Sequence, residues 1–156
     1  MNILPTMEGG LRLEIESPGE WAMLAQIASD ADDQTQVSLP ETLSALMDED
    51  TEWDDLVAPD LQLHFSEQLA HISTAIAHAE QQSEGEEGEL FILRQDSEHW
   101  YGALNQARLA LESRYHFGPT EDIEEIASFP PNKQFAFVRS QFYCRLQSVL
   151  LEYAMD

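Results

Sequence analysis

Residues 133–153, KQFAFVRSQFYCRLQSVLLEY, carry the strongest structural signal in the sequence. Apolar residues recur there at steps of three and four, at Phe135, Val138, Phe142, Leu146, Val149 and Tyr153. This spacing is typical of one side of an α-helix and predicts that the stripe packs into the core. Phe137 and Tyr143 fall outside the stripe, so the helix has more apolar surface than one buried face needs. We therefore expect Phe137 and Tyr143 to form an interface with another subunit.

Two further segments show the same helical spacing. One runs from residue 61 to about 82, and the other runs from Asp96 or Ser97 to about Tyr115, with Gly118 and Pro119 as a stop signal. Their apolar stripes are Leu61, Phe65, Leu69, Ile72 and Ile76 in the first helix, and Trp100, Leu104, Ala107, Leu111 and Tyr115 in the second. Shorter helices are predicted at 17–29, 40–47 and 120–127. The first of these begins with a capping box of Ser17, Pro18 and Glu20.

Two short segments have strand character. Residues 10–16 alternate apolar and polar side chains, and residues 90–94 contain the apolar run Leu-Phe-Ile-Leu. A pair of strands is marginal by itself, so we expect it to lie against the helices. The sequence thus predicts a mainly α fold, a single-domain helical bundle over 1–156 with a minor two-stranded β pair. Flexible acidic loops are expected at about 30–38 and 83–89.

The composition excludes several functions. The 156 residues include 30 acidic and 7 basic side chains, which give a formal charge of −23. Binding to nucleic acid or to an anionic membrane surface depends on Lys and Arg, so neither is expected. No apolar run is long enough to span a bilayer, and the first residues do not resemble a signal peptide. The single cysteine, Cys144, agrees with a reducing cytoplasm, and such acidity would also suit a salty cell interior.

Charge is distributed unevenly along the chain. Residues 1–93 hold 21 acidic residues and one basic residue, whereas residues 94–156 hold 9 acidic and 6 basic residues. If both parts share one core, the late arginines face an excess of carboxylates from the early part. We expect ion pairs between early carboxylates and the five late arginines, Arg94, Arg108, Arg114, Arg139 and Arg145.

One helix carries a candidate metal site. His64, Glu67 and His71 follow one another at steps of three and four, so they share one flank of their helix. Zinc takes four ligands, so this site would need further residues from another helix, such as His99 or His116. The alternative interpretation is that the histidines border a contact between two helices.

A polar stripe accompanies the apolar stripe of the 97–115 helix. It consists of Tyr101, Asn105, Arg108 and Glu112, and Arg108 is one turn away from Glu112. A functional interpretation makes Asn105 and Arg108 an anchor for a carboxylate of a peptide ligand. The structural interpretation is a hydrogen-bonded network with Glu112 that fixes how the helices pack, since buried polar groups need partners.

The remaining polar features give little support to catalysis. The acidic segment 48–55 surrounds Trp53, but it lacks the glycine and the terminal glutamate of a calcium-binding loop, so a solvated acidic loop is the simpler interpretation. The sequence has no Gly-rich phosphate loop, no nucleophile elbow and no His-Glu-x-x-His motif. Cys144 lies inside a helix, where cysteine is usually inert. We predict no catalytic residue and no cofactor.

The stretch from Trp100 to Leu111, WYGALNQARLAL, resembles the signature helix of the bacterial Domain of Unknown Function 2017 family. The resemblance extends to the opening strand and helix, to the acidic segment before residue 61 and to the closing helix at 142–151. The chain departs from the family pattern at Glu112, where the family often has glycine, and in the scarcity of basic residues in its first half. The resemblance implies a helical cytoplasmic domain without an assigned reaction. It also implies a role in protein interaction, because the family's genes are loosely associated with that of an adaptor for the Clp protease.

Three hypotheses about function follow. The first is a non-enzymatic, adaptor-like protein-interaction module, with a homodimer as one form of the contact. The second is a metal-binding sensor or metal-dependent enzyme that uses His64, Glu67 and His71. The third is an acidic partner of basic proteins. We favour the first, because the last helix has apolar residues on more than one face and the sequence lacks catalytic motifs.

Overall fold

The computed structural model describes residues 1–31, 58–118 and 122–155. Its elements are β1 (Asn2–Pro5), β2 (Leu11–Ile15), α1 (Pro18–Ala31), α3 (Ala58–Gln82), β3 (Gly88–Ile92), the 3₁₀ helix η2 (Arg94–Asp96), α4 (Ser97–Tyr115), α5 (Ile123–Ala127) and α6 (Pro131–Tyr153). The fold is mainly α with a small antiparallel sheet, as the sequence predicts. The predicted helix at 40–47 and the acidic segment around Trp53 lie outside the described residues.

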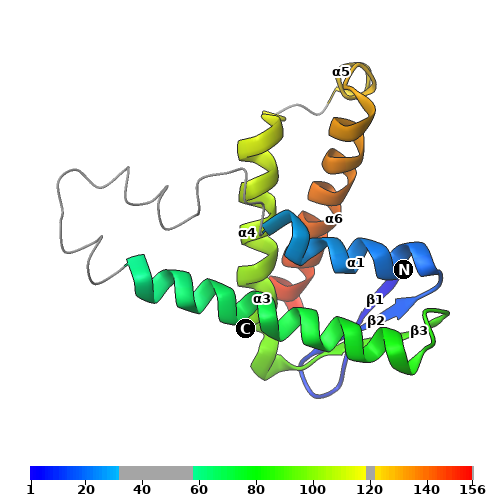
Figure 1. The fold of residues 1–156 in the computed structure, drawn as a ribbon. Coiled ribbons are helices and arrows are strands. Elements are labelled where there is room, and N and C mark those ends of the chain that lie inside the picture. Colours follow the sequence, from blue (N-terminus) through cyan, green and yellow to red (C-terminus); the bar gives the residue numbers. More distant parts are fainter. Residues whose placement is uncertain (32–57, 119–121, 156) are drawn as a thin grey trace.

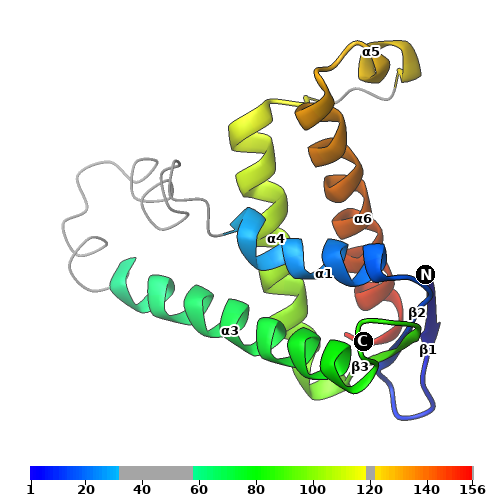
Figure 2. The same cartoon turned by 45° about the vertical axis from the view of Figure 1, so that its right-hand side comes forward.

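Helix α4 lies in the middle of the molecule and contacts α1, α3 and α6. Helices α4 and α6 run side by side, while α1 and α3 cross α4 (Figures 1 and 2). The sheet lies near the beginning of α4 and the end of α6, and α5 lies at the opposite end of this helix pair (Figure 2). The N-terminal half of α6 therefore extends beyond α1, with α4 beside it. No described helix is long and apolar enough to cross a membrane.

The buried side chains of the described elements form one hydrophobic cluster. The stripes predicted for the 61–82 and 97–115 helices are confirmed in their central residues, which are completely or almost completely buried. These residues are Ile72 and Ile76 in α3, and Trp100, Leu104, Ala107 and Leu111 in α4. Helix α1 buries Trp21, Leu24 and Ile27, which have the same spacing. The side chain of Leu61 lies outside the described part of α3.

The sheet has three strands where the sequence predicted two. The predicted pairing of β2 with β3 is confirmed, with Leu13 opposite Leu90 in antiparallel register. On its other side β2 pairs with β1, which places Ile3 opposite Leu13. The prediction missed β1 because its short sequence lacks alternation and contains Pro5. An edge strand tolerates proline there, since an outward-facing N–H needs no partner in the sheet.

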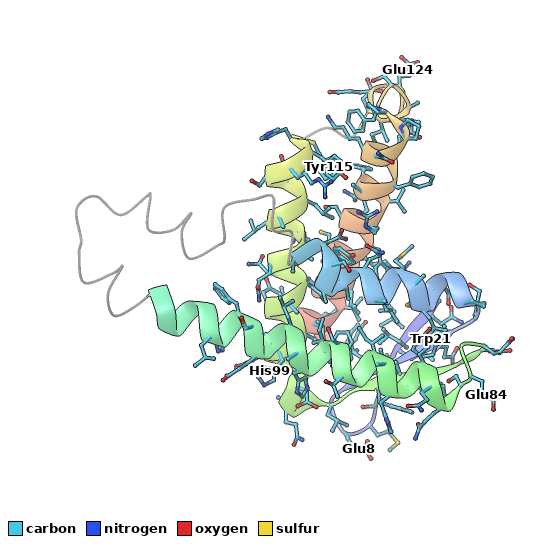
Figure 3. The ribbon with its side chains drawn as sticks, viewed as in Figure 1. Glu8, Trp21, Glu84, His99, Tyr115 and Glu124 are labelled. Carbon is cyan, nitrogen blue, oxygen red and sulfur yellow. The ribbon has the colours of Figure 1, made fainter. Side chains whose placement is uncertain are left out.

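One helix end differs from the sequence prediction. Helix α1 includes Asp30, which the sequence assigned to a loop. Helix α4 ends at Tyr115, as predicted, and His116 after it adopts a left-handed conformation with φ of 51°. The turn between α3 and β3 contacts α1, where the indole Nε1 of Trp21 donates a 2.7 Å hydrogen bond to the backbone oxygen of Glu86 (Figure 3).

Candidate functional site

Helix α6 exposes most of the apolar stripe that the sequence predicted to be buried. Phe135 is 66% exposed, Val138 is 55% exposed and Tyr153 is 46% exposed. Phe142 and Val149 are half-buried, and only Leu146 of the six predicted residues is completely buried. The prediction that this stripe faces the core is therefore wrong. We call the five residues with exposed surface the α6 stripe: Phe135, Val138, Phe142, Val149 and Tyr153.

The face of α6 that packs into the core lies about a quarter of a turn around the helix from the α6 stripe. Its buried residues include Ala136, Tyr143, Leu146 and Leu150. Tyr143 is completely buried inside its own chain, so the expectation that it forms an interface with another subunit is wrong. The sequence identified two apolar faces on this helix, but it assigned the exposed face to the core and the buried face to an interface.

A buried ion pair determines which face of α6 turns inward. The Arg139 guanidinium donates two hydrogen bonds to the Asp30 carboxylate, from Nε to Oδ2 at 2.8 Å and from Nη2 to Oδ1 at 3.0 Å. The Tyr143 hydroxyl donates a third bond to Oδ2 of Asp30 at 2.6 Å. A buried carboxylate without partners is strongly destabilising. Turning the α6 stripe into the core would carry Arg139 and Tyr143 away from Asp30.

This contact shifts the pKa values of two of its members. Burial and the hydrogen bond to Asp30 raise the pKa of the Tyr143 hydroxyl well above its ordinary value of 10.0. The hydrogen bonds from Arg139 to Asp30, together with the charge of that carboxylate, raise the pKa of Arg139. Arg139 thus stays charged and Tyr143 stays a neutral donor throughout the physiological pH range.

Sequence analysis predicted an ion pair between Arg139 and an early carboxylate, and this pair exists, but it did not identify Asp30 as the partner. One signal was available. Asp30 follows Ile27 by three residues and so continues the spacing of Trp21, Leu24 and Ile27. A carboxylate at a core position of a helix needs a buried partner from another element.

Arg108 of the predicted polar stripe contacts α6. Its guanidinium donates to Oε1 of the buried Gln147, and Nε2 of Gln147 donates to the backbone oxygen of Tyr101 at 3.3 Å. The Glu112 carboxylate instead accepts a bond from a backbone N–H beyond the end of α4, and Asn105 is half-buried on α4. The Arg108 contact joins α4 to α6 and supports the structural interpretation of this stripe.

Phe137 lies in an aromatic cluster inside the chain. Its ring meets Phe117 edge-on at a centroid distance of 5.4 Å and Phe129 at 6.2 Å. Phe117 also stacks on Tyr115 at 5.8 Å. The cluster joins the end of α4 to the beginning of α6, so one part of the half-buried Phe137 packs within the chain, and the interface expected at its remaining surface stays a prediction.

The charges on α6 differ from those of the whole chain. Among residues 131–153 there are three basic residues, Lys133, Arg139 and Arg145, and one acidic residue, Glu152. Arg139 is held in the buried ion pair, and Nζ of Lys133 lies 4.1 Å from the centroid of an aromatic ring. Arg145 and Glu152 are exposed, and each follows a residue of the α6 stripe by three positions. These two opposite charges therefore border the stripe.

The histidines of the predicted metal site have separate surroundings. Nε2 of His64 lies 3.2 Å from a glutamine side chain one turn later, and Glu67 is exposed. The His71 ring stacks on His99 of α4 at a centroid distance of 4.7 Å, and its Nε2 lies 3.5 Å from Oδ1 of Asp96 (Figure 3). Within residues 1–31, 58–118 and 122–155, no three His, Cys, Asp or Glu side chains are arranged to hold a metal ion.

A buried pair of glutamines joins α3 to α4, and sequence analysis did not identify it. Nε2 of Gln106 donates to Oε1 of Gln68 at 3.2 Å and lies 3.4 Å from the backbone oxygen of Phe65. Gly102 provides the space, because a Cβ at this position would lie 2.4 Å from the amide of Gln68. Glutamine is usually exposed, so apolar spacing contains no signal for such a pair.

The chain was also compared with known proteins. It matches the family described as Domain of unknown function (DUF2017) over residues 4–154. No curated protein and no solved structure shows significant similarity to it. The matched region contains α1, α4 and α6, and with them both the buried ion pair and the α6 stripe. Because the match covers nearly the full chain, this protein belongs to the DUF2017 family.

Proposed function

We propose that this protein is a protein-interaction module and that the α6 stripe is its binding surface. The observation that carries the proposal is the exposure of Phe135, Val138 and Tyr153 on one side of a helix whose neighbouring side is packed in the core. Contiguous apolar surface bordered by charged residues is typical of protein-binding sites. Aromatic residues are also enriched among those that dominate binding energy.

The position of the stripe supports the same proposal. The N-terminal half of α6, with Phe135 and Val138, extends beyond α1, so a partner can reach it without displacing the core (Figures 1 and 2). The buried ion pair with Asp30 holds α6 in this rotation. The exposed stripe is thus a fixed feature of the folded chain, because burying it would require breaking that pair.

The test compares two variants with the same added charge. Val138→Asp changes the α6 stripe, and Leu151→Asp changes a side chain that is 49% exposed on the same helix. Leu151 follows Phe142 by nine residues, about two and a half turns, and so lies on the opposite side of α6. Both positions are exposed, so thermal unfolding of each variant should stay within about 0.5 kcal/mol of the wild type.

Binding is then measured by cross-linking the tagged full-length chain in the cells that naturally produce it and quantifying every co-purified protein, untagged copies of the chain included. Tyr153→Asp, at a stripe side chain that is 46% exposed near the other end of α6, is measured beside them. We expect a partner of the stripe to be lost in Val138→Asp or in Tyr153→Asp, according to the half of the stripe that it contacts, and to be retained in Leu151→Asp. If both stripe variants capture the same proteins at the same level as the wild type, the α6 stripe is not a binding surface.

A further inference from the structure

We infer that the C-terminal half of the α6 stripe, Phe142, Val149 and Tyr153, binds the same half of a second copy of this chain, with the two helices antiparallel about a two-fold axis near Val149. Phe135 and Val138 lie outside this contact, because α6 ends at Tyr153 and has no residues to place opposite them. This inference rests on the proposed function and specifies the partner. Its basis is the pair of opposite charges that borders the stripe, Arg145 and Glu152.

Arg145 and Glu152 are too far apart to form an ion pair with each other within one chain. Arg145 and Glu152 are seven residues apart, so they lie on the same edge of the helix, about 10 Å from each other along its axis. Side chains that form ion pairs on one helix are three or four residues apart. Both side chains are exposed. The Glu152 carboxylate accepts a hydrogen bond from the neighbouring Tyr153 hydroxyl, which leaves its negative charge open to a cation that approaches from outside.

An antiparallel two-fold pair satisfies both charges at once. A two-fold axis at the level of Val149 places Arg145 of each copy opposite Glu152 of the other, which gives two reciprocal ion pairs. The same axis brings the two Val149 side chains together and places Phe142 of each copy near Tyr153 of the other. An interface that repeats one patch in this way is the usual form of a homodimer contact.

The charge of the rest of the chain favours this face over others. Two copies with a formal charge of −23 each repel one another strongly at most orientations. The α6 stripe is bordered by one basic and one acidic side chain, Arg145 and Glu152, because Arg139 is paired with Asp30 and Lys133 lies away from the stripe. These two charges cancel, so two copies repel each other less at this face than the charge of the whole chain implies. The face is apolar and locally neutral, and it therefore gives a basic partner no net attraction.

The experiment measures self-association of the purified full-length protein by sedimentation velocity in reducing buffer, so that Cys144 cannot cross-link two copies. The proteins are the wild type, Arg145→Glu, Glu152→Arg and the double variant with both changes. Each single change replaces both symmetry-related ion pairs of the dimer with pairs of like charges. We therefore expect it to weaken the dimer by at least about tenfold. The double variant exchanges the charges and should restore the dimer to within about threefold of the wild type.

Lys133→Glu is the matched control, because it changes the net charge as much as Arg145→Glu does but lies away from the stripe. It should leave the dimer within about threefold of the wild type. A wild type that stays monomeric at all concentrations overturns the inference, as does a double variant no better than the single variants. If the wild type is monomeric while Val138→Asp still loses its cellular partners, the proposed function stands and only the choice of partner is wrong.

Discussion

Tyr143 is the residue whose chemistry the fold changes most. It is completely buried, and its hydroxyl donates a hydrogen bond to a carboxylate that Arg139 already neutralises. Burial and the negative charge of Asp30 both disfavour the phenolate, so the pKa of Tyr143 is raised above its ordinary value of 10.0. In the unfolded chain the same hydroxyl faces water and titrates near pH 10.

The first prediction concerns the pH dependence of stability. At about pH 8, Tyr143→Phe should lower the free energy of unfolding by about 2 kcal/mol, because a hydrogen bond to a charged acceptor is lost. The contribution of Tyr143 is fully present below pH 10 and is lost above it, since only the unfolded chain then releases the proton. The wild type should therefore lose about 1.4 kcal/mol more than the variant for each pH unit above 10.

Urea titrations of both proteins between about pH 8 and pH 11.5 measure this difference. The remaining tyrosines are common to both proteins, so their titration cancels in the comparison. A difference that stays constant across this range would show that the fold does not raise the pKa of Tyr143.

At the scale of elements, the contact between α3 and α4 depends on a missing side chain. Gly102 leaves room for the amide of Gln68, which in turn accepts a bond from Gln106. Glycine inside a helix costs up to about 1 kcal/mol relative to alanine. Its presence in the middle of α4 is explained by the close approach of Gln68.

The second prediction is a coupling between Gly102 and Gln68. In the wild type, Gly102→Ala should be neutral or destabilising by up to about 1 kcal/mol, because the gain in helix propensity is offset by the displaced glutamine. In the Gln68→Ala background the same substitution should stabilise the protein by about 0.5–1 kcal/mol. Denaturant unfolding of the four proteins gives the coupling energy, expected at about 0.5–2 kcal/mol. Additive effects would mean that Gln68 does not require the glycine.

Across the whole molecule, the main electrostatic effect is repulsion among acidic side chains. The formal charge of −23 comes from 30 acidic and 7 basic residues. Such an excess destabilises the compact state through self-repulsion. The pair between Asp30 and Arg139 is partly shielded from solvent, so added salt screens it less than it screens the exposed carboxylates.

The third prediction follows from this balance. Raising NaCl from about 10 mM to about 1 M shortens the Debye length from about 30 Å to about 3 Å. The melting temperature of the dilute protein should rise by about 5 °C, which corresponds to about 1–2 kcal/mol of relieved repulsion. KCl should have the same effect as NaCl if screening is the cause. A melting temperature that is unchanged or lower in high salt would contradict the prediction.

Much of the helical fold could be predicted from the sequence, and α4 shows why. Trp100, Leu104 and Leu111 are apolar, their neighbours on the other sides of the helix are largely polar, and all three are buried as predicted. Helix α6 has apolar residues on two sides, so its spacing predicts a helix without identifying the inner face. This ambiguity affected the prediction of the candidate site most, because sequence analysis placed the exposed α6 stripe in the core.

By itself, the sequence determined that the chain is mainly helical, where its long helices lie and that its acidic side chains far outnumber its basic ones. These properties depend on residues close together in the chain or on composition. Only the tertiary structure decided which side of α6 is exposed, because that choice depends on Asp30 and Arg139, which are 109 positions apart. A helical period is a local property, whereas the partner of a buried charge is fixed only when distant elements pack together.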